Sequence, residues 1–303
     1  MIEILRAGLC DLVMDLGRPG QGALGLPAGG AADPAALAAA NRLVGNDVGA
    51  AGLEITLSGP RLRFPQGGVA ALTGARFAAS RSSGAPVAWN ETLVLAAGES
   101  LSLDRPVAGC RCWLAVRGGV AVPPVMGSRS TFLPSGFGGH CGRPLQAGDV
   151  LRCDAPAGEL RLLRACPPPG EADSRLRVVA GPQVSQFDDA GLAAFFGRPY
   201  RVDAASDRRG LRLAGVPVSH RQADLPSQGV LPGAIQIPPD GQPIILGWDG
   251  PVTGGYPVIA GVITADVPRL AQLRPGDAIR FVTIEVEAAR EQAAMSWTIR
   301  ELA

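Results

Sequence analysis

Glycine and proline interrupt the apolar residues of this sequence at short intervals, and this feature limits the possible folds more than any other. The runs between them are short and rich in β-branched residues, which is typical of strands bounded by turns. The predicted strands include 67–73, 107–116, 175–179, 235–237, 243–246, 258–264 and 279–286. The sequence therefore predicts a mainly β fold.

Few segments have the signals of a helix. The segment 33–43 begins with Asp33 as a helix cap and Pro34 at the first helical position, before an Ala/Leu run. The segments 188–196 and 267–273 have similar acidic or proline-containing starts. We therefore expect only a few short helices among the strands.

One turn pattern occurs three times, at 95–103, 145–153 and 273–281. In each copy a glycine is followed by Glu or Asp and then by an alternating strand, so the glycine is expected to adopt positive φ. The recurrence suggests related β modules, and the proline-rich segment 167–174 resembles a stiff connector. We predict β-barrel-like domains at 1–166 and 175–303, with the linker between them and a ligand crevice at their interface.

Composition excludes several classes of function. The formal net charge is +1 without a basic stripe, and no apolar run approaches the ~20 residues of a membrane span, so neither nucleic acid nor membrane is an expected partner. The start lacks the apolar core of a signal peptide, which predicts a cytoplasmic protein. The chain has no lysine, which excludes an ordinary P-loop and a Schiff base. Its six cysteines form no C-x-x-C pair, so neither a zinc ribbon nor a thioredoxin-type motif is predicted, and a metal cluster of Cys110, Cys112, His140 and Cys141 stays an alternative.

The segment 233–266 is the strongest candidate for a binding site. It places a polar loop, 248–257, between runs that are typical of buried strands. Adjacent Gly254 and Gly255 would allow a ligand to approach backbone N–H groups, while Thr253, Asp249 and Tyr256 supply side-chain donors and acceptors. An ordinary hairpin connection is the alternative interpretation.

Several motifs occur in a fixed order along the chain, and together they are specific. They are DLGRPG from Asp15, LEITLSGP from Leu53, GSRST from Gly127, SDRRG from Ser206, IQIPPDGQPI from Ile235 and TGGYP from Thr253. In this order they resemble the biotin-dependent carboxyltransferase-like family. This family includes the C subunit of bacterial 5-oxoprolinase, the antagonist of the sporulation kinase inhibitor, the second subunit of allophanate hydrolase and the carboxyltransferase part of urea carboxylase. The resemblance implies two cyclophilin-like β-barrel domains.

The resemblance also implies a function. The first hypothesis is a C subunit of a complex that hydrolyses the cyclic amide 5-oxoproline to glutamate. That complex uses ATP, and the chain would be active only with a KipI-like B subunit and an A subunit. The alternatives are carboxyl transfer from carboxybiotin to urea or another amide, with biotin on a separate carrier, and a non-catalytic antagonist of a kinase inhibitor.

Candidate site residues follow from this chemistry, in which ATP-dependent opening of an amide creates a crowded anionic transition state. Arginine forks and backbone N–H groups can stabilise such charge without lysine. The candidate catalytic residues are Arg129, Asp249, Tyr256 and Glu54. The candidate substrate or anion contacts are Arg18, Ser128, Ser130, Arg208, Gln236, Thr253, Gly254 and Gly255.

Structural roles compete with several of these assignments. Arg18 and Arg129 are as strongly expected to clamp loop carbonyl groups as to bind a ligand. Glu54 is expected to be a buried hydrogen-bonding group on an apolar strand. Asp33 is expected to cap a helix and not to bind a ligand. Tyr256 either covers the crevice or packs against its neighbours.

Overall fold

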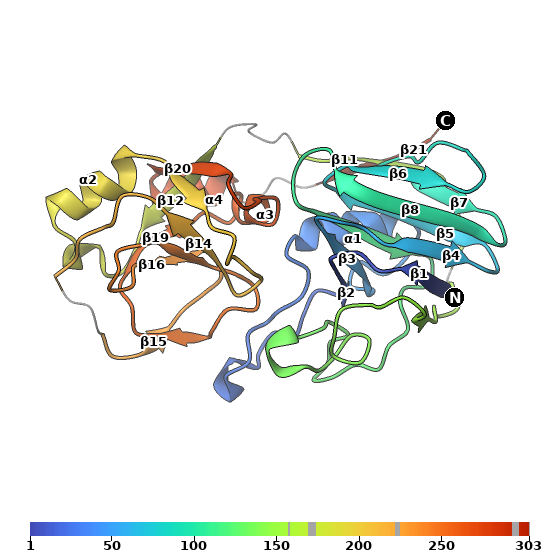
Figure 1. Cartoon of the computed structure of the whole chain (residues 1–303), viewed down its shortest axis with the longest axis horizontal. Coiled ribbons are helices and arrows are strands. Elements are labelled where there is room, and N and C mark those ends of the chain that lie inside the picture. The colour runs from blue at the N-terminus through green and yellow to red at the C-terminus, as the bar shows by residue number, and fades with distance from the viewer. Residues whose placement is uncertain (157, 169–173, 222–224, 293–296, 303) are drawn as a thin grey trace. The chain divides into compact units, whose positions relative to one another are not determined.

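The computed structural model describes residues 1–156, 158–168, 174–221, 225–292 and 297–302. The chain divides into two compact units (Figure 1). Unit 1 comprises Met1–Arg18, Gly29–Pro169 and Ser296–Ala303, and unit 2 comprises Pro19–Ala28 and Gly170–Met295. The mainly β fold with few helices that the sequence predicts is confirmed.

Unit 1 is built on two five-stranded sheets. One has the order β10-β1-β4-β8-β6 and the other the order β2-β3-β9-β5-β7. Their strands are β1 (Ile2–Arg6), β2 (Cys10–Met14), β3 (Gly52–Thr56), β4 (Arg61–Phe64), β5 (Gly68–Gly74), β6 (Phe77–Arg81), β7 (Thr92–Leu95), β8 (Glu99–Pro106), β9 (Arg111–Val116) and β10 (Val150–Leu151). Apolar residues from both sheets, such as Ile4, Leu62, Leu53 and Leu114, form a single core.

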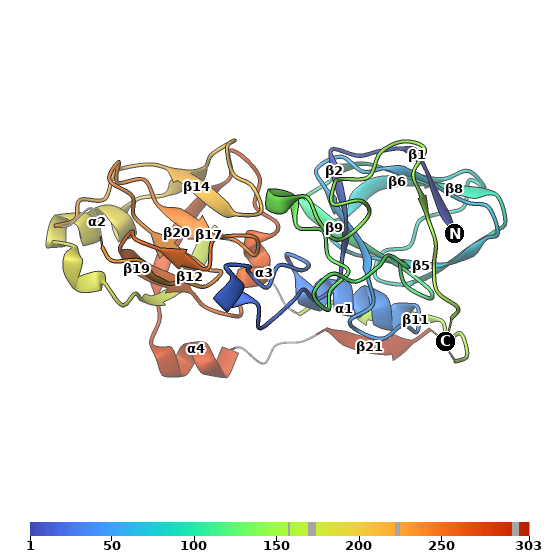
Figure 2. The same cartoon turned by 90° about the horizontal axis from the view of Figure 1, so that it is seen from below.

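Helix α1 (Pro34–Leu43) covers the other face of the second sheet, against β5 and β9 (Figure 2). As predicted, Asp33 caps it, because its carboxylate accepts a hydrogen bond of 2.9 Å from the Ala36 N–H. The small residues Ala40, Ala71 and Ala115 lie in the core between helix and sheet. A short 3₁₀ helix, η2 (Leu133–Ser135), also belongs to this unit.

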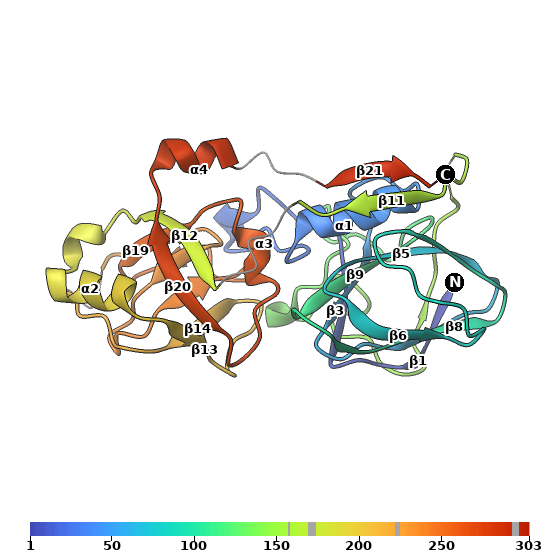
Figure 3. The same cartoon turned by 90° about the horizontal axis from the view of Figure 1, so that it is seen from above.

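The C-terminal strand corrects the predicted domain limits. Strand β21 (Thr298–Glu301) pairs antiparallel with β11 (Leu163–Cys166) in unit 1, and Figure 3 shows them side by side. The prediction places all of 175–303 in the second domain, because a linear division cannot detect a strand that returns to the first. Most of the predicted linker 167–174 lies outside the described residues.

Unit 2 is a closed seven-stranded barrel in the order β12-β19-β16-β17-β14-β13-β20. These strands are β12 (Arg175–Ala180), β13 (Tyr200–Val202), β14 (Gly210–Ala214), β16 (Ala234–Gln236), β17 (Ile244–Leu246), β19 (Val258–Val262) and β20 (Ala278–Thr283). Ile235, Ile245, Ile259 and Phe281 are among the residues that fill its core. A separate pair, β15 (Gln228–Gly229) and β18 (Thr253–Gly254), lies outside the barrel sheet.

Short helices and 3₁₀ turns accompany the barrel. They are α2 (Asp189–Gly197), α3 (Val267–Leu270), α4 (Val286–Gln292), η1 (Gly22–Leu24) and η3 (Val184–Gln186). The helix α2 contributes Phe195, which stacks on Phe281 with ring centroids 4.4 Å apart. Helix α4 replaces the end of the predicted strand 279–286, because β20 stops at Thr283. Among the described residues, no helix has the length and apolar character needed to cross a membrane.

Candidate functional site

Asp15 is the centre of a buried hydrogen-bond network in unit 1. Its Oδ1 accepts hydrogen bonds from the Ser128 and Ser130 hydroxyl groups, both at 2.6 Å, and from the Gly17 N–H at 2.8 Å. Its Oδ2 accepts a bond of 2.5 Å from the Arg129 N–H. The network joins two of the sequence motifs, since Asp15 begins DLGRPG and the serines belong to GSRST. Ser128 and Ser130 therefore direct their hydroxyl hydrogens toward Asp15.

Arg18 is buried, with 2% of its surface exposed. Its guanidinium donates a hydrogen bond of 2.6 Å to the Ser130 carbonyl and lies 5.0 Å from the centre of the Phe137 ring. These contacts correspond to the predicted loop clamp. Arg129 has a freer side chain, which is 34% exposed and lies 3.4 Å from the Asp154 carboxylate. Of these two arginines, Arg129 is the better placed to contact an anion.

Glu54 lies on β3 and is fully buried. One of its carboxylate oxygens accepts hydrogen bonds from the Ala32 N–H at 2.7 Å and the Trp113 indole at 3.1 Å. Arg111 lies 3.6 Å from the other oxygen. These contacts anchor the loop before α1 to the sheet, so the structure places Glu54 in the predicted buried hydrogen-bonding role.

In unit 2, Arg208 and Asp249 form an ion pair with each other. The Arg208 Nε and Nη2 atoms donate to the two Asp249 oxygens at 2.7 and 3.1 Å. Both side chains are buried, with 7% and 1% of their surface exposed. Two candidates assigned separately to anion binding and catalysis thus form one buried pair, which holds the Gly247–Gly250 turn against the Arg208–Arg209 backbone.

The remaining candidates in unit 2 lie close together around β18. Thr253 and Gly254 form this strand and pair with β15, and Gly255 and Tyr256 follow it. Gln236, on β16, is buried, and its amide nitrogen lies 3.5 Å from the Tyr256 carbonyl oxygen. The polar loop predicted from the sequence therefore brings Gln236, Gly254 and Tyr256 together.

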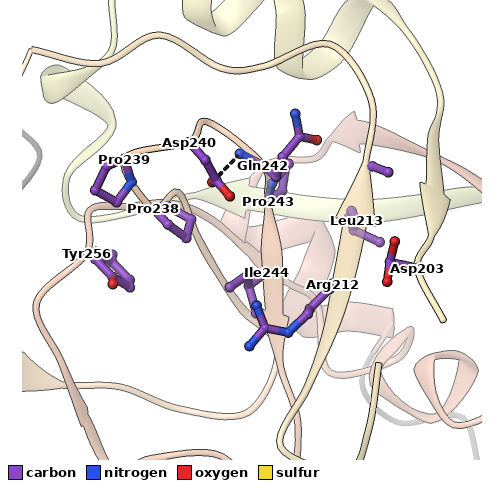
Figure 4. A pocket seen from close by; sticks show the side chains of 11 residues that line it. Asp203, Arg212, Leu213, Pro238, Pro239, Asp240, Gln242, Pro243, Ile244 and Tyr256 are labelled. Carbon is purple, nitrogen blue, oxygen red and sulfur yellow. Dashed lines mark hydrogen bonds between the residues drawn. The ribbon is translucent and has the colours of Figure 1, made fainter. Parts of the chain in front are cut away.

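Tyr256 also lines a cavity of about 590 Å³ within unit 2 (Figure 4). Figure 4 shows Pro238 and Ile244 between the Tyr256 ring and the Arg212 side chain. Asp203 and Asp240 add carboxylates, so the cavity combines a cation, two anions and an apolar floor. A volume in this range suits a small ligand. Sequence reasoning missed Arg212, although it lies only a few residues after the SDRRG motif.

Burial changes the ionisation of two carboxyl groups in unit 1. Desolvation raises the pKa of Asp11 from 3.8 to about 7, although the Gly8 N–H and Arg6 act in the opposite direction. Desolvation likewise raises the pKa of Asp33 to about 6. Neither group lines the cavity of unit 2, so these shifts concern the stability of unit 1.

The histidine, cysteine and carboxylate side chains that the structure describes form no metal-binding cluster. In the described ranges, no group of three His, Cys, Asp or Glu side chains is arranged to hold a metal ion. Cys112, Cys141, Cys153 and Cys166 are free thiols, and of these Cys141 and Cys166 are exposed. His140 lies 3.3 Å from the Asp149 carboxylate, which also binds Arg143.

Comparisons with known proteins extend over nearly the whole chain. Residues 24–283 match the family described as "Carboxyltransferase domain, subdomain A and B". The C subunit of 5-oxoprolinase from Escherichia coli (strain K12) is 43% identical over 299 residues, which cover 95% of this chain and 93% of that protein. The protein of the same name from Haemophilus influenzae is 35% identical, with coverage of 95% and 93%.

A solved structure is similar as well. The urea amidolyase of K. lactis superposes with a TM-score of 0.87 at 32% sequence identity. The match covers 95% of this chain but only 19% of the amidolyase chain. This chain therefore corresponds to one part of that larger protein.

Proposed function

We propose, from the premise that this chain belongs to the carboxyltransferase domain family, subdomains A and B, that it acts as the C subunit of a 5-oxoprolinase. The family predicted from the motifs is confirmed by this match. The observation that carries the proposal is the 43% identity to the E. coli protein, of which 93% is covered. In this role the chain would contribute to the opening of 5-oxoproline to glutamate.

The cavity beside Tyr256 is the proposed binding place for the amide substrate. Its apolar floor, formed by Pro238 and Ile244, suits the carbon atoms of a five-membered ring. The Arg212 guanidinium has no ion-pair partner among the residues that the structure describes, so it is available for the substrate carboxylate. The Tyr256 side chain, 38% exposed, would cover the ring.

ATP would supply the free energy for opening the lactam, but two of the arginines predicted to bind an anion are held by contacts within the chain. Arg18 is buried against the Ser130 carbonyl and the Phe137 ring. Arg208 is paired with Asp249. We therefore propose that ATP binds elsewhere in the complex and that Arg129, a predicted catalytic residue with a partly exposed side chain, contacts an anion in unit 1.

The names of the relatives support a multi-subunit assembly, because both bacterial proteins are named as C subunits. We propose a KipI-like B subunit and an A subunit as the partners. The chain is then expected to show no activity without them, and to work in the cytoplasm.

Reconstitution tests this function. Glutamate release from 5-oxoproline is measured with and without ATP, using the three proteins together and each omitted in turn. Release that requires ATP and this chain is the expected result. An assembled complex that leaves 5-oxoproline intact would refute the proposal.

The similarity to urea amidolyase supports a second candidate, carboxyl transfer from carboxybiotin to an amide. Because this sequence has no lysine, the biotin of such a reaction cannot be attached to it. Avidin separates the two candidates, since it should block biotin-dependent transfer and leave 5-oxoproline hydrolysis unchanged.

A further inference from the structure

Three glutamine side chains of unit 2 meet around Gly254, and we call them the glutamine cluster: Gln183, Gln228 and Gln236. Gln183 precedes η3, Gln228 lies on β15 and Gln236 on β16. The sequence predicts only Gln236 as a ligand contact. The other two come from segments 45 residues apart, joined by a hydrogen bond between their amides.

The orientation of Gln183 is fixed by the backbone. The Val258 N–H donates a hydrogen bond of 3.1 Å to Gln183 Oε1, and the Gln183 N–H lies 3.4 Å from the Val258 carbonyl. An N–H group can only donate, so the atom facing Val258 must be the amide oxygen of Gln183. The Gln183 nitrogen consequently points away from Val258.

This orientation determines the next amide in turn. Gln183 Nε2 donates a hydrogen bond of 2.9 Å to Gln228 Oε1. The Gln228 nitrogen must then occupy the opposite position of its amide group. Within the described part of the chain, Gln228 Nε2 is buried and has no hydrogen-bond acceptor. A buried N–H₂ group without a partner is unfavourable, so a defined donor without an acceptor indicates a place for a ligand oxygen.

Gly254 brings the third glutamine to the same place. Gln228 lies directly opposite Gly254 in the β15–β18 pair, so its side chain projects on the side where a Gly254 β-carbon would project. That β-carbon would lie 2.5 Å from Gln236 Nε2, which leaves no room for a side chain. The missing β-carbon therefore leaves room for the Gln236 amide beside Gly254, the residue that pairs with Gln228. The only hydrogen bond of Gln236 Nε2 among the described residues is the long one, 3.5 Å, to Tyr256.

We infer that the glutamine cluster recognises the carboxamide group of the substrate, with Gln228 Nε2 donating to the amide carbonyl oxygen and Gln183 acting as a positioning residue. This inference rests on the proposed function and extends it, because it assigns amide recognition to particular atoms. Gln228 as a whole is only partly buried, whereas its Nε2 atom is buried. Gln236 offers a second amide group to the same ligand.

A binding comparison tests the inference in the assembled complex without ATP. Calorimetry measures the affinity for 5-oxoproline and for cyclopentanecarboxylate, which keeps the ring and the carboxylate but lacks the amide. Gln228→Leu should weaken 5-oxoproline binding by about ten- to hundredfold and leave cyclopentanecarboxylate binding unchanged. The exposed Gln146 of unit 1 provides the control variant, Gln146→Leu, which should change neither affinity.

A second variant reverses the hydrogen-bond direction with little change of shape. In Gln183→Glu, one carboxylate oxygen still accepts from Val258, and the other accepts from Gln228 only if the Gln228 amide turns over. Gln228 would then present its oxygen to the substrate carbonyl, so this variant should also lose selectivity for 5-oxoproline. Gln228→Glu, which is nearly isosteric, should behave like Gln228→Leu and serves if the leucine variant does not assemble.

Two results would overturn the inference. Either 5-oxoproline binds the Gln228 and Gln183 variants with wild-type affinity, or both ligands weaken equally, which indicates a purely structural role. Failure of the proposed function is a separate result, because it appears as absence of glutamate release by the wild-type complex. In that case the affinities of the wild type and the glutamine variants for urea are compared in place of those for 5-oxoproline. A loss of urea binding in the variants would still show that the cluster recognises amides.

Discussion

Replacement of Asp11 by asparagine is expected to stabilise unit 1 at pH 8 and to change its stability little at pH 4. Asp11 lies on β2 with 1% of its surface exposed. Its Oδ2 accepts a hydrogen bond of 2.5 Å from the Gly8 N–H, while its buried Oδ1 has no hydrogen-bond partner in the described ranges. The charged form is therefore poorly solvated, whereas asparagine stays neutral and can retain the bond from Gly8.

The raised pKa fixes the sign and size of the effect. The folded protein holds the Asp11 proton more tightly than the unfolded chain. The contribution of this group to the free energy of unfolding is therefore fully present below about pH 4 and is lost as the pH rises through about 7. The difference between 3.8 and about 7 corresponds to about 4 kcal/mol, at 1.36 kcal/mol for each pKa unit. We expect Asp11→Asn to recover roughly 2–4 kcal/mol at pH 8, since partial solvation reduces the full value.

Hydrogen exchange of amides in β2, β3 and β9 provides a local assay, because it reports the opening of unit 1 alone. Variant and wild type are compared at the same pH, so the intrinsic pH dependence of exchange cancels. Asp33, whose pKa is about 6, adds a loss of stability in the same direction and is present in both proteins. The control is Asp47→Asn, a change at an exposed carboxylate that accepts from the Gly49 N–H. Equal protection of Asp11→Asn and wild type at pH 8 would refute the reasoning.

Three further predictions concern the polar groups of the two units. Asp249→Ala should lower the free energy of unfolding of unit 2 by about 3–5 kcal/mol, measured by urea denaturation, because it removes the carboxylate that binds two nitrogen atoms of the buried Arg208 guanidinium. Unchanged stability would show that this pair is well solvated. Asp15→Ala should destabilise unit 1 by about 2 kcal/mol or more, since it removes the acceptor for the Ser128 and Ser130 hydroxyl groups. Equal exchange rates in the GSRST segment would contradict it. Arg212→Met should raise the KM of the complex for 5-oxoproline about tenfold or more with little change in kcat. An unchanged KM would exclude the cavity as the carboxylate site.

The repeated turn shows how much of the fold the sequence predicts. In all three copies the glycine has positive φ: 79° at Gly98, 92° at Gly148 and 90° at Gly276. The following acid accepts a hydrogen bond from the N–H three residues before it, at 2.8, 2.7 and 2.8 Å. These contacts are local, so a short sequence pattern contains the information for them.

Pairings between distant segments could not be predicted in this way. Strand β21 joins β11 across more than a hundred residues, and nothing in either sequence specifies the other. The same applies to the Gln183–Gln228 bond, because β15 has only two residues and no hydrophobic alternation. Sequence reasoning misses helix α4 for a different reason. Its sequence, VEAAREQ, favours a helix, but it directly follows the β-branched run of β20, and the predicted strand extends to Val286.

Most of the polar residues that the motifs single out have hydrogen-bonding partners within the protein. Asp15 and Glu54 bind loop N–H groups, and Asp249 is paired with Arg208. The motifs therefore identified mainly residues that hold the loops in place. They were less successful in identifying residues that are available to a ligand. Groups that retain hydrogen-bonding capacity include Gln228, with its buried donor, and Arg212, in the cavity. An amide donor and a guanidinium are the two kinds of contact that a ligand with one amide and one carboxylate uses, so the Gln228 and Arg212 variants together decide whether 5-oxoproline contacts both groups.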